Sequence, residues 1–206
     1  MVELLDIYNE NAVKIGVKAR EAVHRDGDWH RTFHCWIVYR DGAGRDFMVV
    51  QRRGPDKQSY PNLLDVSAAG HYEAGESIAD GVREIQEELG IQVDFADLVP
   101  VGMKYSAYRA FGMIDREFND VFLLDDDRPL SAYVPQAEEV SDLVCFSIDD
   151  GLALFAEECS AIPAESRTMG RISLHQSDFV YPPDHYTYRV LVLAKRYLNG
   201  EKYLVI

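Results

Sequence analysis

Cysteine, long apolar runs and positive charge are all scarce in this chain of 206 residues. Its three cysteines are Cys35, Cys145 and Cys159, and an odd number at wide spacing argues against disulfides or a zinc site. We expect buried free thiols in a reducing compartment. No apolar run approaches the roughly 20 residues that span a bilayer, and the first residues lack the basic start and apolar segment of a secretion signal. These absences predict a cytoplasmic protein with no membrane partner.

The charge balance is strongly acidic. Asp and Glu number 35 against 21 Lys and Arg, for a formal net charge of -14. Nucleic acid polymers are bound through clustered Lys and Arg that release counterions, so a polymer partner is disfavoured. A small phosphate ligand remains compatible with this composition if metal ions screen the acids. The hydrophobic content of 47% is that of an ordinary globular core.

Strand-like runs alternate with a few helical segments. HCWIVYR and DFMVVQRR, separated by DGAGR, predict a hairpin with glycine-bearing turn chemistry. Further strand-like runs cover 63–70, 98–108, 117–125 and 140–147, and a helix-start signature follows the last of them. We therefore expect an α/β (α+β) fold in which helices pack on a mixed β-sheet.

The C-terminal part has helical periodicity. An apolar series recurs at helical spacing and is followed by the stop signal Asn199-Gly200; its members are Tyr188, Leu191, Ala194, Tyr197 and Leu198. We interpret it as a packing helix. The alternative is a tyrosine-rich ligand wall formed by Tyr181, Tyr186 and Tyr188.

The stretch GHYEAGESIADGVREIQEELGI is the most informative part of the chain. Ser77 with Asp80 resembles a capping box, and Gly90 is placed for a left-handed cap, so a helix is predicted from Ile78 to Leu89. An apolar stripe follows the spacing of one helix face and should be buried; it consists of Ile78, Val82, Ile85 and Leu89.

Three glutamates, Glu84, Glu87 and Glu88, share a neighbouring face of this helix. Like charges at this spacing oppose helix formation, and anions near a helix C-terminus are also unfavourable. A solvated acidic face is one explanation. The other is a site for Mg²⁺ or Mn²⁺, which prefer clustered carboxylate oxygens, with a backbone carbonyl at Gly70 completing the ligands.

The same stretch resembles the Nudix box, a pattern of Gly, five residues, Glu, seven residues, then Arg-Glu-aliphatic-any-Glu-Glu-any-Gly-aliphatic. The matching residues are Gly70, Glu76, Arg83, Glu84, Ile85, Glu87, Glu88, Gly90 and Ile91. Only six residues separate Glu76 from Arg83, which puts the orientation of Glu76 in question. Gly81 inside the helix costs about 1 kcal/mol relative to Ala and is explained either by close backbone approach or by simple tolerance.

The resemblance implies a Nudix hydrolase with an α/β/α sandwich. We expect one domain over 1–206, with an N-terminal extension to about 30 and a C-terminal helical extension from about 160. It further implies Mg²⁺- or Mn²⁺-dependent hydrolysis of a phosphoanhydride bond in a nucleoside or other organic diphosphate. The implied catalytic residues are Glu84, Arg83 and Glu88, and the implied metal ligands are Gly70, Glu84, Glu87 and Glu88. A base outside the box would be Asp120, Glu138 or Glu139.

The segment QRRGPDK supplies Arg52, Arg53 and Lys57 just before the box. Arginine offers a bidentate fork to phosphate, so these cations are candidate substrate-binding residues. The alternative is a charge cluster at a hairpin end.

A narrower resemblance is to the isopentenyl-diphosphate isomerase branch of the same fold. That branch holds a metal through histidines, and His24, His30 and His71 lie at about the matching positions as a possible second metal cluster. The cysteine that the isomerase needs is replaced by Ala69, which can neither donate nor accept a proton. Hydrolase is therefore preferred, with an isomerase or a non-catalytic binding module as alternatives.

The identity of the substrate is left open by the sequence. Tyr60, Tyr105, Tyr108 and Phe111 either line a ligand site or belong to the core. A homodimer is the default expectation for a soluble oligomer.

Overall fold

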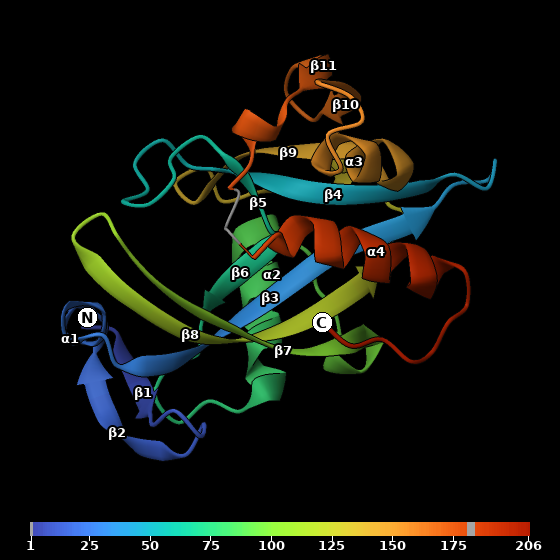
Figure 1. Ribbon diagram of the computed structural model, residues 1–206. Coiled ribbons are helices and arrows are strands. Elements are labelled where there is room, and N and C mark those ends of the chain that lie inside the picture. Colours follow the sequence, from blue (N-terminus) through green and yellow to red (C-terminus); the bar gives the residue numbers. More distant parts are fainter. Residues whose placement is uncertain (1, 181–183) are drawn as a thin grey trace.

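The computed structural model describes residues 2–180 and 184–206, and a mixed β-sheet runs through it (Figure 1). The strands are β1 (Leu4–Tyr8), β2 (Lys14–Ala19), β3 (Trp29–Arg40), β4 (Asp46–Arg53), β5 (Leu64–Asp65), β6 (Ala68–His71), β7 (Leu98–Ala110), β8 (Met113–Asp125), β9 (Val140–Ser147), β10 (Ile162–Ser166) and β11 (Gly170–Leu174). The helices are α1 (Arg20–Asp26), α2 (Val82–Leu89), α3 (Ile148–Phe155) and α4 (Tyr186–Leu198). Short 3₁₀ turns cover Ile78–Gly81, Phe95–Asp97, Leu130–Ala132 and Gln176–Asp178.

The long strand β3 organises the sheet. It pairs in parallel with β8 along one edge, while its other edge pairs antiparallel first with β6 and then with β4. The main path runs β11-β10-β9-β4-β3-β1-β2, and β7 extends the sheet beyond β8. One parallel pair among antiparallel ones confirms the predicted mixed sheet, and the predicted hairpin forms between β3 and β4.

The two faces of the sheet are covered by different helices. Because side chains alternate along a strand, Phe33, Cys35 and Ile37 of β3 point into the core under α2. Trp36 and Val38 point into the core under α3 and α4. Figure 1 shows α2 behind the sheet and α4 in front of it, which is the helix–sheet–helix layering of a sandwich.

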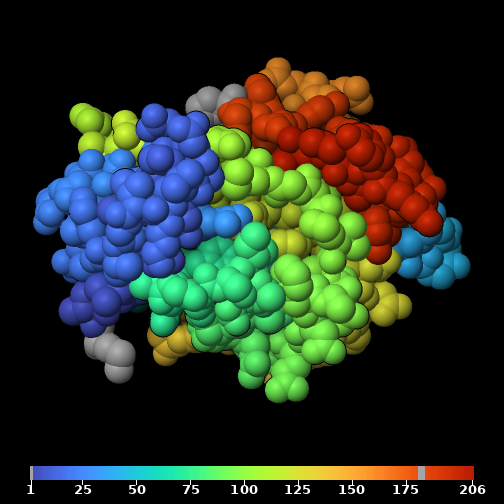
Figure 2. Space-filling model, turned by 90° about the horizontal axis from the view of Figure 1, so that it is seen from below, coloured from blue at the N-terminus to red at the C-terminus, as the bar shows by residue number. Residues whose placement is uncertain are grey.

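The N-terminal segment, where no element was predicted, forms a β1–β2 hairpin followed by α1. Leu5, Ile7 and Val23 make a small core of their own. Gly27 ends α1 in the left-handed conformation, at φ 74°. In the space-filling view this blue segment packs against the green middle of the chain, and the red C-terminal helix lies along another side (Figure 2).

The acidic helix begins differently from the prediction. The Ser77–Asp80 cap forms, with Ser77 N donating to Asp80 Oδ2 over 2.7 Å, and Gly90 is the left-handed cap. The first turn, however, is 3₁₀, so Ile78 leaves the stripe and is 39% exposed. Its predicted burial was wrong, because a 3₁₀ turn rotates successive side chains by a different angle from an α-helix.

Gly81 takes the inward position at the start of α2. A Cβ there would lie 2.6 Å from the ring of Phe33 and 2.8 Å from that of Tyr72. Close backbone approach therefore explains this glycine, and its helix-propensity cost is offset by packing of the helix start against β3 and β6.

The C-terminal helix α4 packs against the sheet as predicted, burying Val190, Leu191 and Ala194. Its first residue, Tyr186, also lines the cleft described below. Tyr188 packs against the core, and Tyr181 lies outside the described residues. Cys35 and Cys145 are buried free thiols, while Cys159 is half-buried. No helix in the described part of the chain has the length and apolar character to cross a membrane.

Candidate active site

A glycine in β6 lets the acidic helix approach the sheet closely. A Cβ on Gly70 would lie 2.1 Å from the carboxyl carbon of Glu84, so no other residue fits without displacing that side chain. One turn further along α2, Glu88 accepts hydrogen bonds from Ala69 N at 2.9 Å and from Gln51 Nε2 at 3.0 Å. Both carboxylates are thereby held at the end of β6.

These two carboxylates are buried and electrostatically unfavourable. Glu84 is 9% exposed and Glu88 is 6% exposed. Burial raises the pKa of Glu84 to about 7 and that of Glu88 to about 8. The charge of Glu84 also raises the pKa of Glu88, and the charges of Glu87 and Glu76 raise that of Glu84. A solvated acidic face would show neither the burial nor the shift. The pKa of Glu84 is raised although the charge of Arg83 lowers it, so a proton or a further cation would stabilise this pair.

Arg83 lies between the acids at the edge of the cluster. Its guanidinium contacts Glu84 Oε1 at 3.1 Å, Glu76 Oε1 at 3.1 Å and Glu87 Oε2 at 2.8 Å. Glu76 thus reaches Arg83 although the motif is one residue short, because the 3₁₀ turn uses fewer residues per turn than an α-helix. The Glu87 side chain is 51% exposed, so it lies at the rim while Glu84 and Glu88 lie inside.

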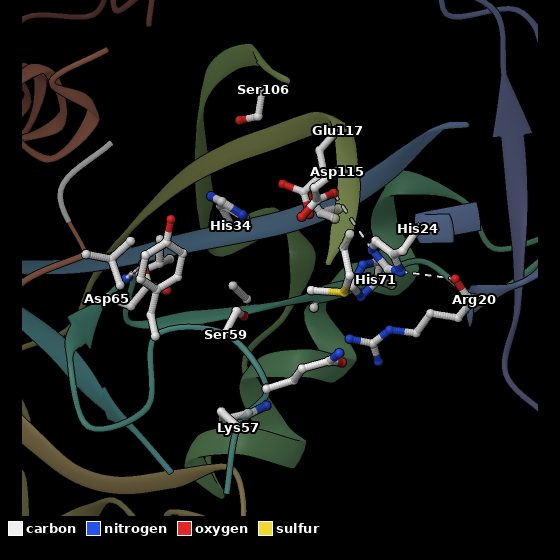
Figure 3. A pocket seen from close by; sticks show the side chains of 18 of the residues that line it. Arg20, His24, His34, Lys57, Ser59, Asp65, His71, Ser106, Asp115 and Glu117 are labelled. Carbon is white, nitrogen blue, oxygen red and sulfur yellow. Dashed lines mark hydrogen bonds and ion pairs between the residues drawn. The ribbon is translucent and has the colours of Figure 1, made fainter. Parts of the chain in front are cut away.

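The histidines His24, His30 and His71 come together from α1, β3 and β6. Asp115 and Glu117 of β8 complete the group, which we call the histidine–carboxylate cluster. The ligand-capable atoms within each of its two overlapping triads, His24-His30-His71 and His30-Asp115-Glu117, lie within 4.8 Å of one another. Figure 3 shows the labelled members of the cluster gathered on one wall of the cleft.

Sequence reasoning missed Asp115 and Glu117. The available signal was their spacing: residues two apart on a strand share a face. Glu117 is also the parallel neighbour of His30 in the β3–β8 register. That register is a long-range pairing, so the two acids could be placed only with the sheet assembled.

The hydrogen bonds around the cluster orient its histidines. Nδ1 of His24 lies 3.0 Å from Arg20 O, and Nδ1 of His30 lies 3.2 Å from Asp28 O. Since a carbonyl only accepts, each Nδ1 must carry a proton, and Nε2 of the neutral His30 ring presents a lone pair. Burial also lowers the pKa of His30 to about 4 and that of His71 well below its ordinary value, so both rings are neutral.

Several inward atoms of the cluster lack a hydrogen-bond partner within the described chain. They are Nε2 of His30, Nε2 of His71 and Oδ1 of Asp115, all of them buried. The Asp115 oxygen is 3.7 Å from His30 Nε2 and 3.8 Å from His24 Nε2. Atoms bound to one cation at about 2.1 Å lie about 3 to 4 Å apart. The donor set and its spacing therefore fit a divalent metal.

One cleft is lined by residues of both groups of candidate metal ligands and by cationic side chains. Its lining includes Glu84 and Glu88. His24 and His71 of the cluster also line it, and Figure 3 shows Lys57 on the opposite wall from these two histidines. Lys57 also contacts Glu139, another lining residue.

Of the two arginines predicted to bind substrate, Arg53 lines the cleft and Arg52 does not. Arg53 lines the cleft, although its guanidinium is held by Asp65 at 3.0 Å and by Ser59. Arg52 is not part of the described lining, and it donates to Asn62 O at 2.9 Å. The two arginines differ because successive residues of β4 point to opposite faces.

The aromatic residues left open by the sequence lie outside the core. Tyr105 is 57% exposed, Tyr108 40% and Phe111 48%. Tyr105 and Tyr108 line the cleft together with Tyr60. Tyr60 also contacts Phe111, with ring centroids 4.9 Å apart, so the β7–β8 hairpin tip meets the loop after β4 at the cleft mouth.

Known proteins are similar to this chain in sequence and fold. The NUDIX domain model matches residues 28–164. An uncharacterised Nudix hydrolase of Clostridium acetobutylicum is 38% identical over 93% of this chain and 95% of its own length. An isopentenyl-diphosphate Delta-isomerase of Mycolicibacterium vanbaalenii is 29% identical over 69% of this chain and 76% of its own.

A solved structure from Deinococcus radiodurans superposes with a TM-score of 0.56 at 25% identity, covering 75% of this chain and 90% of that one. The domain match, the near full-length relative and the shared fold agree with the motif on α2. The chain belongs to the Nudix hydrolase family.

Proposed function

We propose that this protein is a divalent-metal-dependent hydrolase that cleaves a phosphoanhydride bond in a small organic diphosphate. One observation carries the proposal: buried Glu84 and Glu88 open into the same cleft as Lys57 and Arg53. Buried acidic side chains are unfavourable unless cations compensate their charge. The metal ion of a metal diphosphate would compensate Glu84 and Glu88, and its phosphate oxygens would compensate Lys57 and Arg53.

Glu84 and Glu88 would hold Mg²⁺ or Mn²⁺, with Glu87 at the rim and the carbonyl of Gly70 as a further ligand. When bound, the ion supplies charge neutralisation and Lewis acidity for phosphoryl transfer. The histidine–carboxylate cluster offers a second place for a divalent ion, favouring a transition metal because imidazole nitrogens are among its donors.

The chain's own residues supply orientation and phosphate recognition. Arg83 positions Glu84 through the contact at 3.1 Å. Lys57 lines the cleft and is suited to donate to a phosphate oxygen. Among the candidate bases outside the box, Glu139 lines the cleft, whereas Asp120 is held by Arg31 at 2.6 Å and Glu138 is outside the described lining.

A second function, isopentenyl-diphosphate isomerisation, is supported by the histidine–carboxylate cluster and by the resemblance to isomerases. Ala69 opposes it, since a methyl group cannot transfer the proton that isomerisation requires. The buried Glu84–Glu88 pair favours hydrolysis.

The extensions on both sides of the matched domain contribute to the cleft. His24 comes from the N-terminal segment and Tyr186 from the C-terminal helix. We therefore treat 1–206 as one functional domain. The buried free thiols fit a reducing compartment such as the cytoplasm, and a homodimer stays the default for an oligomer.

Phosphate release from a panel of nucleoside and non-nucleoside diphosphates, with Mg²⁺ or Mn²⁺, tests the proposal. We expect turnover of at least one member, and its loss in Glu84→Gln. Isomerisation of isopentenyl diphosphate without phosphate release would instead support the second function. Metal-dependent ligand binding without any turnover would identify a binding module.

A further inference from the structure

Beyond the histidine–carboxylate cluster, the cleft continues toward α4 over a polar floor. Thr32 and His34 of β3, Lys104 and Ser106 of β7, and Tyr186 of α4 all line this part, which we call the inner pocket. Tyr186 lies beyond residues 28–164, the range matched by the domain model. The inner pocket is therefore partly built by the C-terminal extension.

Lys104 is the cation of the inner pocket. It is only 8% exposed, and its ammonium contacts Ser106 Oγ and lies 4.7 Å from the ring centroid of Tyr186. Asp184, another lining residue, is 3.2 Å away. This contact shows that the ammonium reaches an anionic acceptor on its cleft side.

His34 adds a second donor beside Lys104. Trp36 Nε1 donates to the Tyr186 hydroxyl at 3.1 Å, so the tyrosine hydrogen is available for His34 Nδ1, also at 3.1 Å. Burial lowers the pKa of His34 to about 3, so the ring is neutral and its remaining proton lies on Nε2. Within the described chain no hydrogen bond occupies that nitrogen, and Figure 3 shows the His34 ring facing the cleft.

The inner pocket is thus rich in donors. Ser106 Oγ and Asp184 already contact the Lys104 ammonium, which leaves one of its three N–H groups together with the His34 N–H. An apolar chain placed here would give neither of these two groups an acceptor, which is unfavourable for buried donors. A group bearing hydroxyl, carboxylate or phosphate oxygens would satisfy both. Sites built to hydrogen-bond a ligand strongly reject analogues that lack the bonding group.

We propose that the inner pocket selects a diphosphate whose organic part carries oxygen acceptors, with Lys104 as the specificity-determining residue, and that it disfavours prenyl chains. The inference rests on the proposed function and narrows its substrate class. The relevant chemistry is that of a hydroxylated or anionic organic group, such as a sugar or a carboxylated chain.

Two probes differ mainly in these oxygens. Isopentenyl diphosphate has an apolar branched chain with a terminal double bond, and mevalonate diphosphate has the same branched carbon skeleton with a hydroxyl and a carboxylate in place of the double bond. Isothermal titration calorimetry with Ca²⁺ in place of Mg²⁺ gives both dissociation constants, and phosphate release with Mg²⁺ is measured separately. In the wild type we expect mevalonate diphosphate to bind at least about tenfold more tightly.

Lys104→Met should reduce this preference to near unity, while Lys202→Met, the same change at an exposed lysine outside the described lining, should keep it. Because Lys104 lies in a polar network, Tyr186→Phe provides a second variant: it retains the ring, releases His34 and should also reduce the preference. Equal affinities in the wild type, or an unchanged preference in folded Lys104→Met, would overturn the inference.

The calorimetric ratio and the turnover answer different questions. A preference that depends on Lys104 supports the selectivity of the inner pocket even where neither probe is hydrolysed. Turnover that is abolished by Glu84→Gln but shows no preference supports the hydrolase and rejects the selectivity.

Discussion

The buried pair Glu84–Glu88 predicts that the metal-free protein loses stability as pH rises. Glu84 has a pKa of about 7 in the folded chain against an ordinary value of 4.5. Between these values the folded state binds more protons than the unfolded state, so the free energy of unfolding falls with increasing pH. The decrease begins near pH 4.5 and is complete above about pH 7 for Glu84. Glu88, with a pKa of about 8, extends it further.

The size of this change in the free energy of unfolding follows from the two pKa values of Glu84. The difference between 4.5 and about 7 corresponds to about 3 kcal/mol for Glu84 alone. Glutamine keeps the shape without the charge, so Glu84→Gln should stabilise the metal-free protein at pH 8 by up to about 3 kcal/mol. Mg²⁺ should stabilise the wild type at pH 8, and this stabilisation should be much smaller in the variant.

Urea unfolding followed by the fluorescence of Trp29 and Trp36 measures these effects at pH 5, 6.5 and 8, with EDTA or with Mg²⁺. Glu87→Gln is the matched control: its side chain is 51% exposed and burial is the main cause of the Glu84 shift, so this substitution should change the pH dependence in EDTA much less than Glu84→Gln does. A wild type whose stability rises across this range, or a Glu84→Gln variant that unfolds, would show that the acids are structural and refute the reasoning.

Further predictions concern single positions. Gly70→Ala should abolish Mg²⁺-dependent turnover while the protein remains folded by circular dichroism, since its Cβ would lie 2.1 Å from the Glu84 carboxyl group. Gly81→Ala should destabilise the protein by about 1 to 3 kcal/mol in urea, despite alanine's higher helix propensity, because of the clash at 2.6 Å with Phe33; stabilisation would contradict the packing role. His30→Gln should reduce the transition metal retained after dialysis, measured by elemental analysis, by about tenfold or more. The exposed control His175→Gln should retain as much metal as the wild type.

The layered fold could be anticipated because its signals are local. Alternation in HCWIVYR places Trp36 and Ile37 on opposite faces, whatever the sheet around them. The strand–turn–strand pattern before the box predicted the β3–β4 hairpin. Local spacing failed at Ile78, because the first turn of the acidic helix is 3₁₀ and not α-helical. It also gave no sign of the hairpin β1–β2, whose small core depends on contact with α1.

The sequence by itself determined that the acids of the helix lie together. Helical spacing places Glu84 and Glu88 on one face, and this is a property of neighbouring residues alone. Their burial raises their pKa values and comes from the packing of α2 on β6, which places Glu84 against Gly70 and Glu88 against Ala69. Likewise, the β3–β8 register places Asp115 and Glu117 beside the histidines. The packing of α4 on the sheet places Tyr186 in the lining of the cleft. Contacts between distant segments depend on which strands pair, and short-range spacing contains no information about that pairing.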